Sequence, residues 1–205
     1  MAKLTLILSF VITLFIIFPK SSPAPTYIVS DCPNTTMFVT KSPYQTNLNT
    51  VFYYLSSNAT SPFGFHEALA GNGTNGMVYG NFLCRGDHSP DSCQDYVTTA
   101  TTTDLPKTYC PNRNIATIWY DQCMVRYSNE SFFGKMDEGG YLLYNAQNIT
   151  GNISQFVDIV NDKMNDIVTT AANGGPNKKY ATGVAQYNSS LTIYGLEQCT
   201  PGGDY

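Results

Sequence analysis

One stretch of the chain decides the fold: FLCRGDHSPDSCQDYV, residues 82–97. It continues an apolar run, Met77–Leu83, which has the composition of a β-strand and ends directly at Cys84. A second cysteine, Cys93, follows after a short polar loop. In an oxidising compartment, cysteines are interpreted first as members of a disulfide framework. The stretch therefore predicts a disulfide-stapled domain.

The end of this strand occurs a second time near the C-terminus. Val78–Cys84 reads VYGNFLC and Ile193–Cys199 reads IYGLEQC, so both have the pattern aliphatic-Tyr-Gly-x-x-x-Cys. Each copy follows an apolar stripe with helical spacing. Because a whole helix-and-strand unit recurs, we expect two structural repeats, a first over residues 25–140 and a second over residues 141–205. The second repeat is expected to be incomplete, since the counterpart of Cys93 would fall beyond the last residue.

Periodicity predicts further elements on either side of these strands. The clearest helix begins after Ser42, and residues 48, 51, 52 and 55 form its apolar face. The prediction of a second helix, over about residues 92–101, is weakened by a threonine-rich tail and by Pro106. The other expected elements are that second helix over about 92–101, a strand over 115–127, a helix with an apolar stripe over 156–171, and strands over 180–185 and 191–198.

The N-terminus predicts the compartment. Lys3 precedes an almost unbroken apolar run, Leu4–Phe18, and small residues follow up to Ala24. This run is short for a membrane-spanning helix, and its flanks are those of a cleaved signal peptide over residues 1–24. No second stretch approaches membrane length. We therefore expect a secreted, extracellular product with no membrane span in the mature chain.

Composition and motifs exclude several classes of function. The formal net charge is −4 and only 13% of residues are charged, which disfavours nucleic acid as a partner. The two histidines, His66 and His88, do not form a zinc-binding pattern with any close cysteine pair, so no metal is expected. No nucleophile motif or phosphate-binding glycine loop is present, and the acidic pair Asp137–Glu138 lies in a glycine-rich turn. The sequence predicts neither an enzyme nor a cofactor.

Two features are typical of secreted proteins. Six cysteines remain after the signal peptide, which suggests a disulfide framework with 15 possible pairings. Seven N-x-Ser/Thr sequons predict surface glycosylation. The sequon asparagines are Asn34, Asn58, Asn72, Asn129, Asn148, Asn152 and Asn188.

The cysteine-containing segments together resemble a known family. The run at residues 82–97, the run WYDQCMVRYSN at Trp119–Asn129, and the later YGLEQCTP segment are similar to the plant cysteine-rich repeat domain. This domain is also called domain of unknown function 26, the ginkgo-nut (Gnk2-homologous) or stress-antifungal domain. Tandem copies resemble cysteine-rich repeat secretory proteins and the ectodomains of cysteine-rich receptor-like kinases. The resemblance implies an α+β fold, with two helices packed on an antiparallel sheet in each repeat.

The resemblance also implies a disulfide pairing. Carried over position by position, it pairs Cys84 with Cys93 and Cys32 with Cys110. In the family, a third bridge joins the cysteine at the position of Cys123 to the last cysteine of the motif. In this chain the position of that last cysteine holds Tyr96. We therefore expect two bridges, with Cys123 and Cys199 left unpaired; the alternatives are a bond between these two cysteines and bonds between chains.

The family's sugar site offers a functional expectation. The ginkgo protein binds mannose through an Asn, an Arg and a Glu, and the matching positions here are Pro33, Thr117 and Ser128. The charged members of that triad are absent, which puts a mannose site of this type in doubt. Asn34, one residue after the matching position, is the candidate sugar-binding residue that remains.

These observations converge on a binding module. We expect a secreted protein of the plant apoplast that acts in defence or cell-surface signalling, by binding a cell-wall or microbial glycan or the ectodomain of a receptor-like kinase. The alternative is a truncated, inactive fragment of a cysteine-rich receptor-like kinase ectodomain.

Overall fold

The structure is a computed structural model that describes residues 24–33, 37–73, 76–135, 139–144, 147–174 and 179–201. The predicted signal peptide up to residue 23, the candidate sugar-binding Asn34 and the acidic pair Asp137–Glu138 lie outside the described residues.

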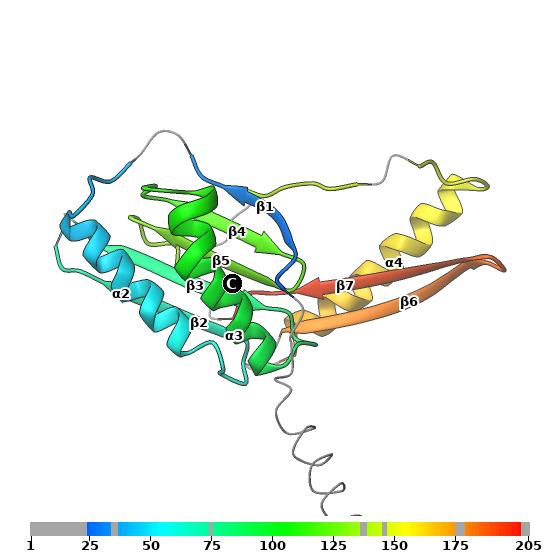
Figure 1. The fold of residues 1–205 in the computed structure, drawn as a ribbon. Helices are drawn as coiled ribbons and strands as arrows, with labels where there is room; N and C mark the ends of the chain where they lie inside the picture. The colour runs from blue at the N-terminus through cyan, green and yellow to red at the C-terminus, as the bar shows by residue number, and fades with distance from the viewer. Residues whose placement is uncertain are drawn as a thin grey trace, which may run out of the picture.

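A five-stranded antiparallel sheet forms the centre of the first half of the chain (Figure 1). Its strands, in spatial order, are β1 (Tyr27–Asp31), β4 (Ala116–Tyr120), β5 (Cys123–Ser128), β3 (Val78–Cys84) and β2 (Phe65–Ala70). The hairpin of β4 and β5 therefore lies between two strands that precede it in the sequence.

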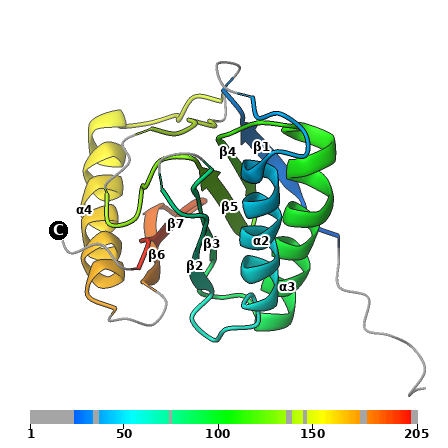
Figure 2. The ribbon, with the colours of Figure 1, turned by 90° about the vertical axis from the view of Figure 1, so that its left-hand side faces the viewer.

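Two helices cover one face of this sheet (Figure 2). Helix α2 (Pro43–Ser57) and helix α3 (Pro90–Thr99) both begin with a serine N-cap and a proline in the first turn. The Ser42 hydroxyl accepts a hydrogen bond from the backbone N–H of Gln45, which satisfies one of the donors that a helix start leaves free. These two Ser-Pro steps fix where each helix starts.

Side chains from the helices and the inner sheet face form one apolar core. Every second residue of β3 points to the helices, and at Gly80 the sheet comes so close to α2 that an added Cβ would lie 2.5 Å from Val51 Cγ1. This residue must be glycine because the helix backbone would otherwise have to move outward. The largest fully buried side chains are Tyr127, Phe82, Leu55, Leu105, Ile118, Val51, Val78, Val97 and Val125.

The second half of the chain forms a smaller helix-and-sheet unit. Helix α4 (Ile153–Ala172) packs on a two-stranded antiparallel sheet of β6 (Tyr180–Asn188) and β7 (Leu191–Gln198). Gly195 of β7 approaches Ile167 of α4 in the way that Gly80 approaches Val51. This equivalence supports an internal repeat, whereas the division at residue 140 stays a prediction.

Three local expectations were wrong. The strand expected over 115–127 is the hairpin of β4 and β5, because a tight turn at Asp121–Gln122 interrupts it. The second helix continues past Pro106 as a π-helical segment, η1 (Ala100–Tyr109). Proline disrupts an α-helical turn because its ring clashes with the preceding turn and it has no N–H to donate, and the helix here has the wider π turn. Strands β1 and β2 were not expected, since their sequences, YIVSD and FHEALA, are short and mixed.

Candidate functional site

A row of five polar side chains crosses the face of the sheet opposite to the helices. In the strand register each residue lies directly beside the next on the neighbouring strand. From one edge of the sheet to the other, this polar row consists of Glu67, Asn81, Arg126, Thr117 and Asp31. One residue from each strand therefore contributes to a single continuous line of acceptors and donors.

The polar row forms the floor of a cavity of about 610 Å³. Trp119 and Met124, from the adjacent row, extend this floor. Segments outside the sheet make the walls, namely residues 132–135, residues 139–141, and Thr200 and Pro201 at the end of the second unit. This volume lies in the range of small-molecule sites in proteins, about 300–1,000 Å³.

Asn81 lies near the centre of the floor with one acceptor unused. Its side chain is 4% exposed, and its Oδ1 atom has no hydrogen-bond partner among the described residues. A buried amide oxygen without a partner costs about 1–3 kcal/mol, so Asn81 is a floor residue whose side chain has a hydrogen bond still to gain.

The charged members of the row are held in place by their surroundings. Burial raises the pKa of the Glu67 carboxyl above its ordinary value. The Arg126 guanidinium lies 4.3 Å from the centre of the Phe132 ring, an arrangement that orients it by cation–π attraction. Glu67 is thus a partly desolvated carboxyl group of the floor, and Arg126 is a cation oriented by the Phe132 ring.

An aromatic pair connects the floor of the cavity to one wall. The Trp119 and Tyr141 rings meet edge-on, with their centroids 5.7 Å apart and an angle of 71° between their planes. Partial desolvation and the nearby Asp31 carboxylate raise the pKa of Tyr141. The segment around Tyr141 thus lies over the Asp31 end of the polar row.

Two of the positions that match the family's mannose triad, Thr117 and Ser128, lie on this face, but neither supplies a charge. Thr117 lies in the middle of the polar row, and Ser128 accepts a hydrogen bond from the Glu130 backbone at 3.0 Å. The acidic and basic groups come instead from Glu67 and Arg126. Sequence reasoning missed both, together with Asn81. The polar residues that alternate with apolar ones in β2, β3 and β5 were the signal that could have identified them.

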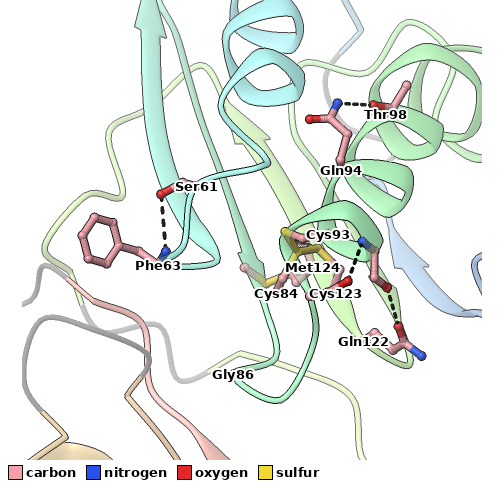
Figure 3. Close-up of a disulfide and its surroundings, with 12 residues drawn as sticks. Ser61, Phe63, Cys84, Gly86, Cys93, Gln94, Thr98, Gln122, Cys123 and Met124 are labelled. Carbon is pink, nitrogen blue, oxygen red and sulfur yellow. Dashed lines mark hydrogen bonds between the residues drawn. A yellow bond between two sulfur atoms is a disulfide. The ribbon is translucent and has the colours of Figure 1, made fainter.

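The structure brings three of the cysteines to one place (Figure 3). Cys32 is bonded to Cys110, and Cys84 to Cys93, with Cα atoms 5.7 Å and 5.9 Å apart. The sulfur of Cys123, which was expected to be unpaired, also lies within bonding range of Cys84. Cys199 is a free, half-buried thiol.

The sequon asparagines that the structure describes all have exposed side chains. They are Asn58, Asn72, Asn129, Asn148, Asn152 and Asn188. Their exposure is compatible with the predicted glycosylation. Within the described segments, no helix is both long and apolar enough to span a bilayer.

The salt stress response/antifungal family matches residues 31–130. The Arabidopsis thaliana cysteine-rich receptor-like protein kinase 25 is 44% identical over 197 residues, which cover 94% of this chain and 28% of the kinase. Cysteine-rich receptor-like protein kinase 9 of Arabidopsis thaliana is 37% identical, and the alignment covers 90% of this chain and 70% of that protein. The chain belongs to this family.

Other members of the salt stress response/antifungal family show how far the likeness extends. Cysteine-rich repeat secretory protein 1 of Arabidopsis thaliana is 28% identical over 91% of this chain and 54% of its own length. The crystal structure of the tandem DUF26 ectodomain of the Arabidopsis thaliana cysteine-rich receptor-like protein PDLP8 superposes with a TM-score of 0.72. That match, at 21% identity, covers 87% of this chain and 79% of the other. The likeness shows that this chain has the fold of such an ectodomain.

The chain spans less than a third of the length of cysteine-rich receptor-like protein kinase 25. The same holds for cysteine-rich receptor-like protein kinase 8 of Arabidopsis thaliana, another relative. The matched part of the kinase relatives is their ectodomain, a non-catalytic region. This member of the salt stress response/antifungal family is therefore a module of the extracellular ectodomain type.

Proposed function

We propose that this module binds a glycan in the cavity over the polar row, in the plant apoplast, in defence or cell-surface signalling. The observation that carries the proposal is the row of polar side chains, one from each strand of the sheet, that forms the cavity floor. Sugar hydroxyls are donors and acceptors at once, so they match a floor on which an amide, a carboxylate, a guanidinium and a hydroxyl stand side by side.

The charges around the cavity favour an uncharged polar ligand. Two acidic residues, Asp31 and Glu67, are balanced by two basic residues, Arg126 and Lys135. A strongly anionic or cationic ligand would meet one like-charged pair wherever it lay, at a cost in Coulomb energy. The edge-on pair of Trp119 and Tyr141 adds the apolar surface against which a sugar ring packs.

A glycan array of cell-wall and microbial oligosaccharides, probed with the secreted chain, tests this proposal. Hits are then titrated by calorimetry against Glu67→Gln and Thr117→Val, which keep side-chain shape and remove a charge or a hydroxyl. Each is expected to weaken binding about tenfold or more, the effect of one lost hydrogen bond to a charged or buried group. Glu130→Gln, an exposed residue outside the cavity lining, is the matched control and is expected to bind like the parent.

The same protein is also tested in a pull-down against receptor-like kinase ectodomains. No signal on the array, together with capture of an ectodomain, would replace the glycan proposal by direct recognition of a receptor. No signal in either experiment would overturn the binding function altogether.

A further inference from the structure

The sulfur atoms of Cys93 and Cys123 both lie next to that of Cys84, and either one can form a disulfide with it. A sulfur atom forms one disulfide at a time, so these bridges are alternatives. The three sulfur atoms all lie within 4.8 Å of one another, and all three residues are buried. Whichever bridge is present, the third cysteine is a thiol in contact range of a disulfide.

The two alternatives connect different elements. Cys84 ends β3 and lies directly opposite Cys123, the first residue of β5, with their Cα atoms 4.1 Å apart. Cys93 lies at the end of the first turn of α3, 5.9 Å from Cys84 between Cα atoms. Disulfide-bonded cysteines usually have Cα separations of about 4.4–6.8 Å. The bridge from strand to helix fits this range and is the resting pair, whereas the cross-strand bridge is the alternative.

We propose that Cys123 is the attacking thiol of an internal disulfide exchange that moves the Cys84 bridge from Cys93 to Cys123. The Cys123 thiolate attacks the sulfur of Cys84, the bond from Cys84 to Cys93 breaks, and Cys93 leaves as a thiolate that takes up the proton lost by Cys123. One disulfide and one thiol are present before and after, so no oxidant or reductant is consumed.

The surroundings of Cys93 suit a leaving thiolate. It lies in the N-terminal part of α3, where the helix dipole stabilises negative charge. Arg85 and His88 line the small cavity that contains Cys84 and Cys93. The acidic groups of this segment are Asp87, which is paired with Arg85 at 2.7 Å, and Asp91 in the first turn of α3.

The exchange acts on a loop that joins the two halves of the molecule. The resting bridge closes the loop of residues 85–92, which contacts the second unit. The Gly86 N–H donates to Gln198 Oε1 at 3.0 Å, and a Cβ added to Gly86 would lie 2.5 Å from Tyr180. Transfer of the bridge to Cys123 replaces a disulfide between β3 and α3 by one between β3 and β5. The N-terminal end of α3 is then no longer bonded to the sheet. The loop then loses the constraint that holds it against Gln198 and Tyr180.

Peptide mapping of the secreted chain tests the exchange. In a Cys199→Ser background, which removes the other free thiol, the protein is incubated at neutral pH and acid-quenched. It is then alkylated with N-ethylmaleimide and digested without reduction. Two linked species are expected by mass spectrometry, one joining Cys84 to Cys93 with Cys123 alkylated, and one joining Cys84 to Cys123 with Cys93 alkylated.

Two variants separate exchange from incomplete oxidation. Cys123→Ser keeps the resting bridge and is expected to lose all alkylation of Cys93. Cys93→Ser leaves Cys123 as the partner of Cys84, and the cross-strand bridge is expected to form. Hydrogen exchange at residues 85–92 is expected to be faster in Cys93→Ser than in Cys123→Ser, because the loop is no longer closed.

Alkylation of Cys93 in the parent that does not exceed that in Cys123→Ser would overturn the proposal, and this comparison holds even if Cys93→Ser does not fold. So would native mass spectra that showed a metal ion on three reduced thiols.

Discussion

The hydroxyl of Tyr96 in α3 donates a 2.9 Å hydrogen bond to the carboxylate of Asp121, in the turn between β4 and β5. Two further contacts lie beside it, since Arg85 Nη1 donates to the Asp121 carbonyl at 3.0 Å and Ser92 Oγ pairs with Gln122 Oε1 at 3.1 Å. The family resemblance places a cysteine at Tyr96, bonded to Cys123. Here residue 96 has no sulfur atom, and hydrogen bonds connect helix and hairpin at this point instead.

Tyr96→Phe is expected to lower the free energy of unfolding by about 0.5–3 kcal/mol, since it removes one hydrogen bond to a charged group and leaves the ring packing intact. Burial, followed by the bond to Asp121, raises the pKa of Tyr96 to about 12, so the hydroxyl remains a donor at neutral pH. Urea unfolding measures the change. Tyr53→Phe, at a tyrosine that is 66% exposed, is the control and is expected to match the parent.

Tyr96→Cys is expected to restore the bridge that the family resemblance implies. Cys123 would then bond to residue 96, and the exchange at Cys84 would stop. A disulfide stabilises a folded domain by roughly 2–4 kcal/mol. The loss of the packing of the tyrosine ring opposes this gain. Non-reducing peptide mapping gives the answer. A Cys123 that remains open to alkylation in the folded variant would contradict the expectation.

The two close-approach glycines allow each half of the molecule to be perturbed separately. Gly80→Ala forces a methyl group against Val51, and Gly195→Ala forces one against Ile167. Each is expected to destabilise its own unit by about 1–3 kcal/mol, the usual cost of overpacking. Amide hydrogen exchange, measured peptide by peptide, is expected to be faster in α2 and β3 in the first variant. In the second variant it is expected to be faster in α4 and β7. Gly140→Ala, with no atom within 4 Å of the added carbon, is the control.

Glu67 is expected to make the stability depend on pH. Because burial raises its pKa in the folded state, the protonated form is favoured by folding. The stability that it contributes is present below its unfolded pKa and is lost as pH rises through the folded value. Glu67→Gln removes this loss, so the variant is expected to gain stability relative to the parent between about pH 3 and about pH 7. Urea unfolding of the variant and the parent at both pH values measures the difference in their free energies of unfolding. The same difference at both pH values would rule out the raised pKa.

Local patterns were enough to identify the main elements. Apolar spacing within α2 and α4, the Ser-Pro start of α2, and the recurring Tyr-Gly-x-x-x-Cys pattern are properties of neighbouring residues, so they can be seen in the chain itself. The hairpin turn at Asp121–Gln122 escaped this reasoning because the sequence there has no Asn-Gly or Asp-Gly signal.

The sequence by itself determined the three α-helices, the strands β3, β6 and β7, the repeated unit and the family. Only the tertiary structure decided which polar residues form the floor of the cavity and which sulfur atoms meet. The reason is physical. Glu67, Asn81, Arg126, Thr117 and Asp31 form a row through the register of strands that lie far apart in the chain. Long-range pairing of this kind leaves no local pattern, because each strand alternates polar and apolar residues in the same way whatever partner it has. The same pairing sets Cys123 opposite Cys84.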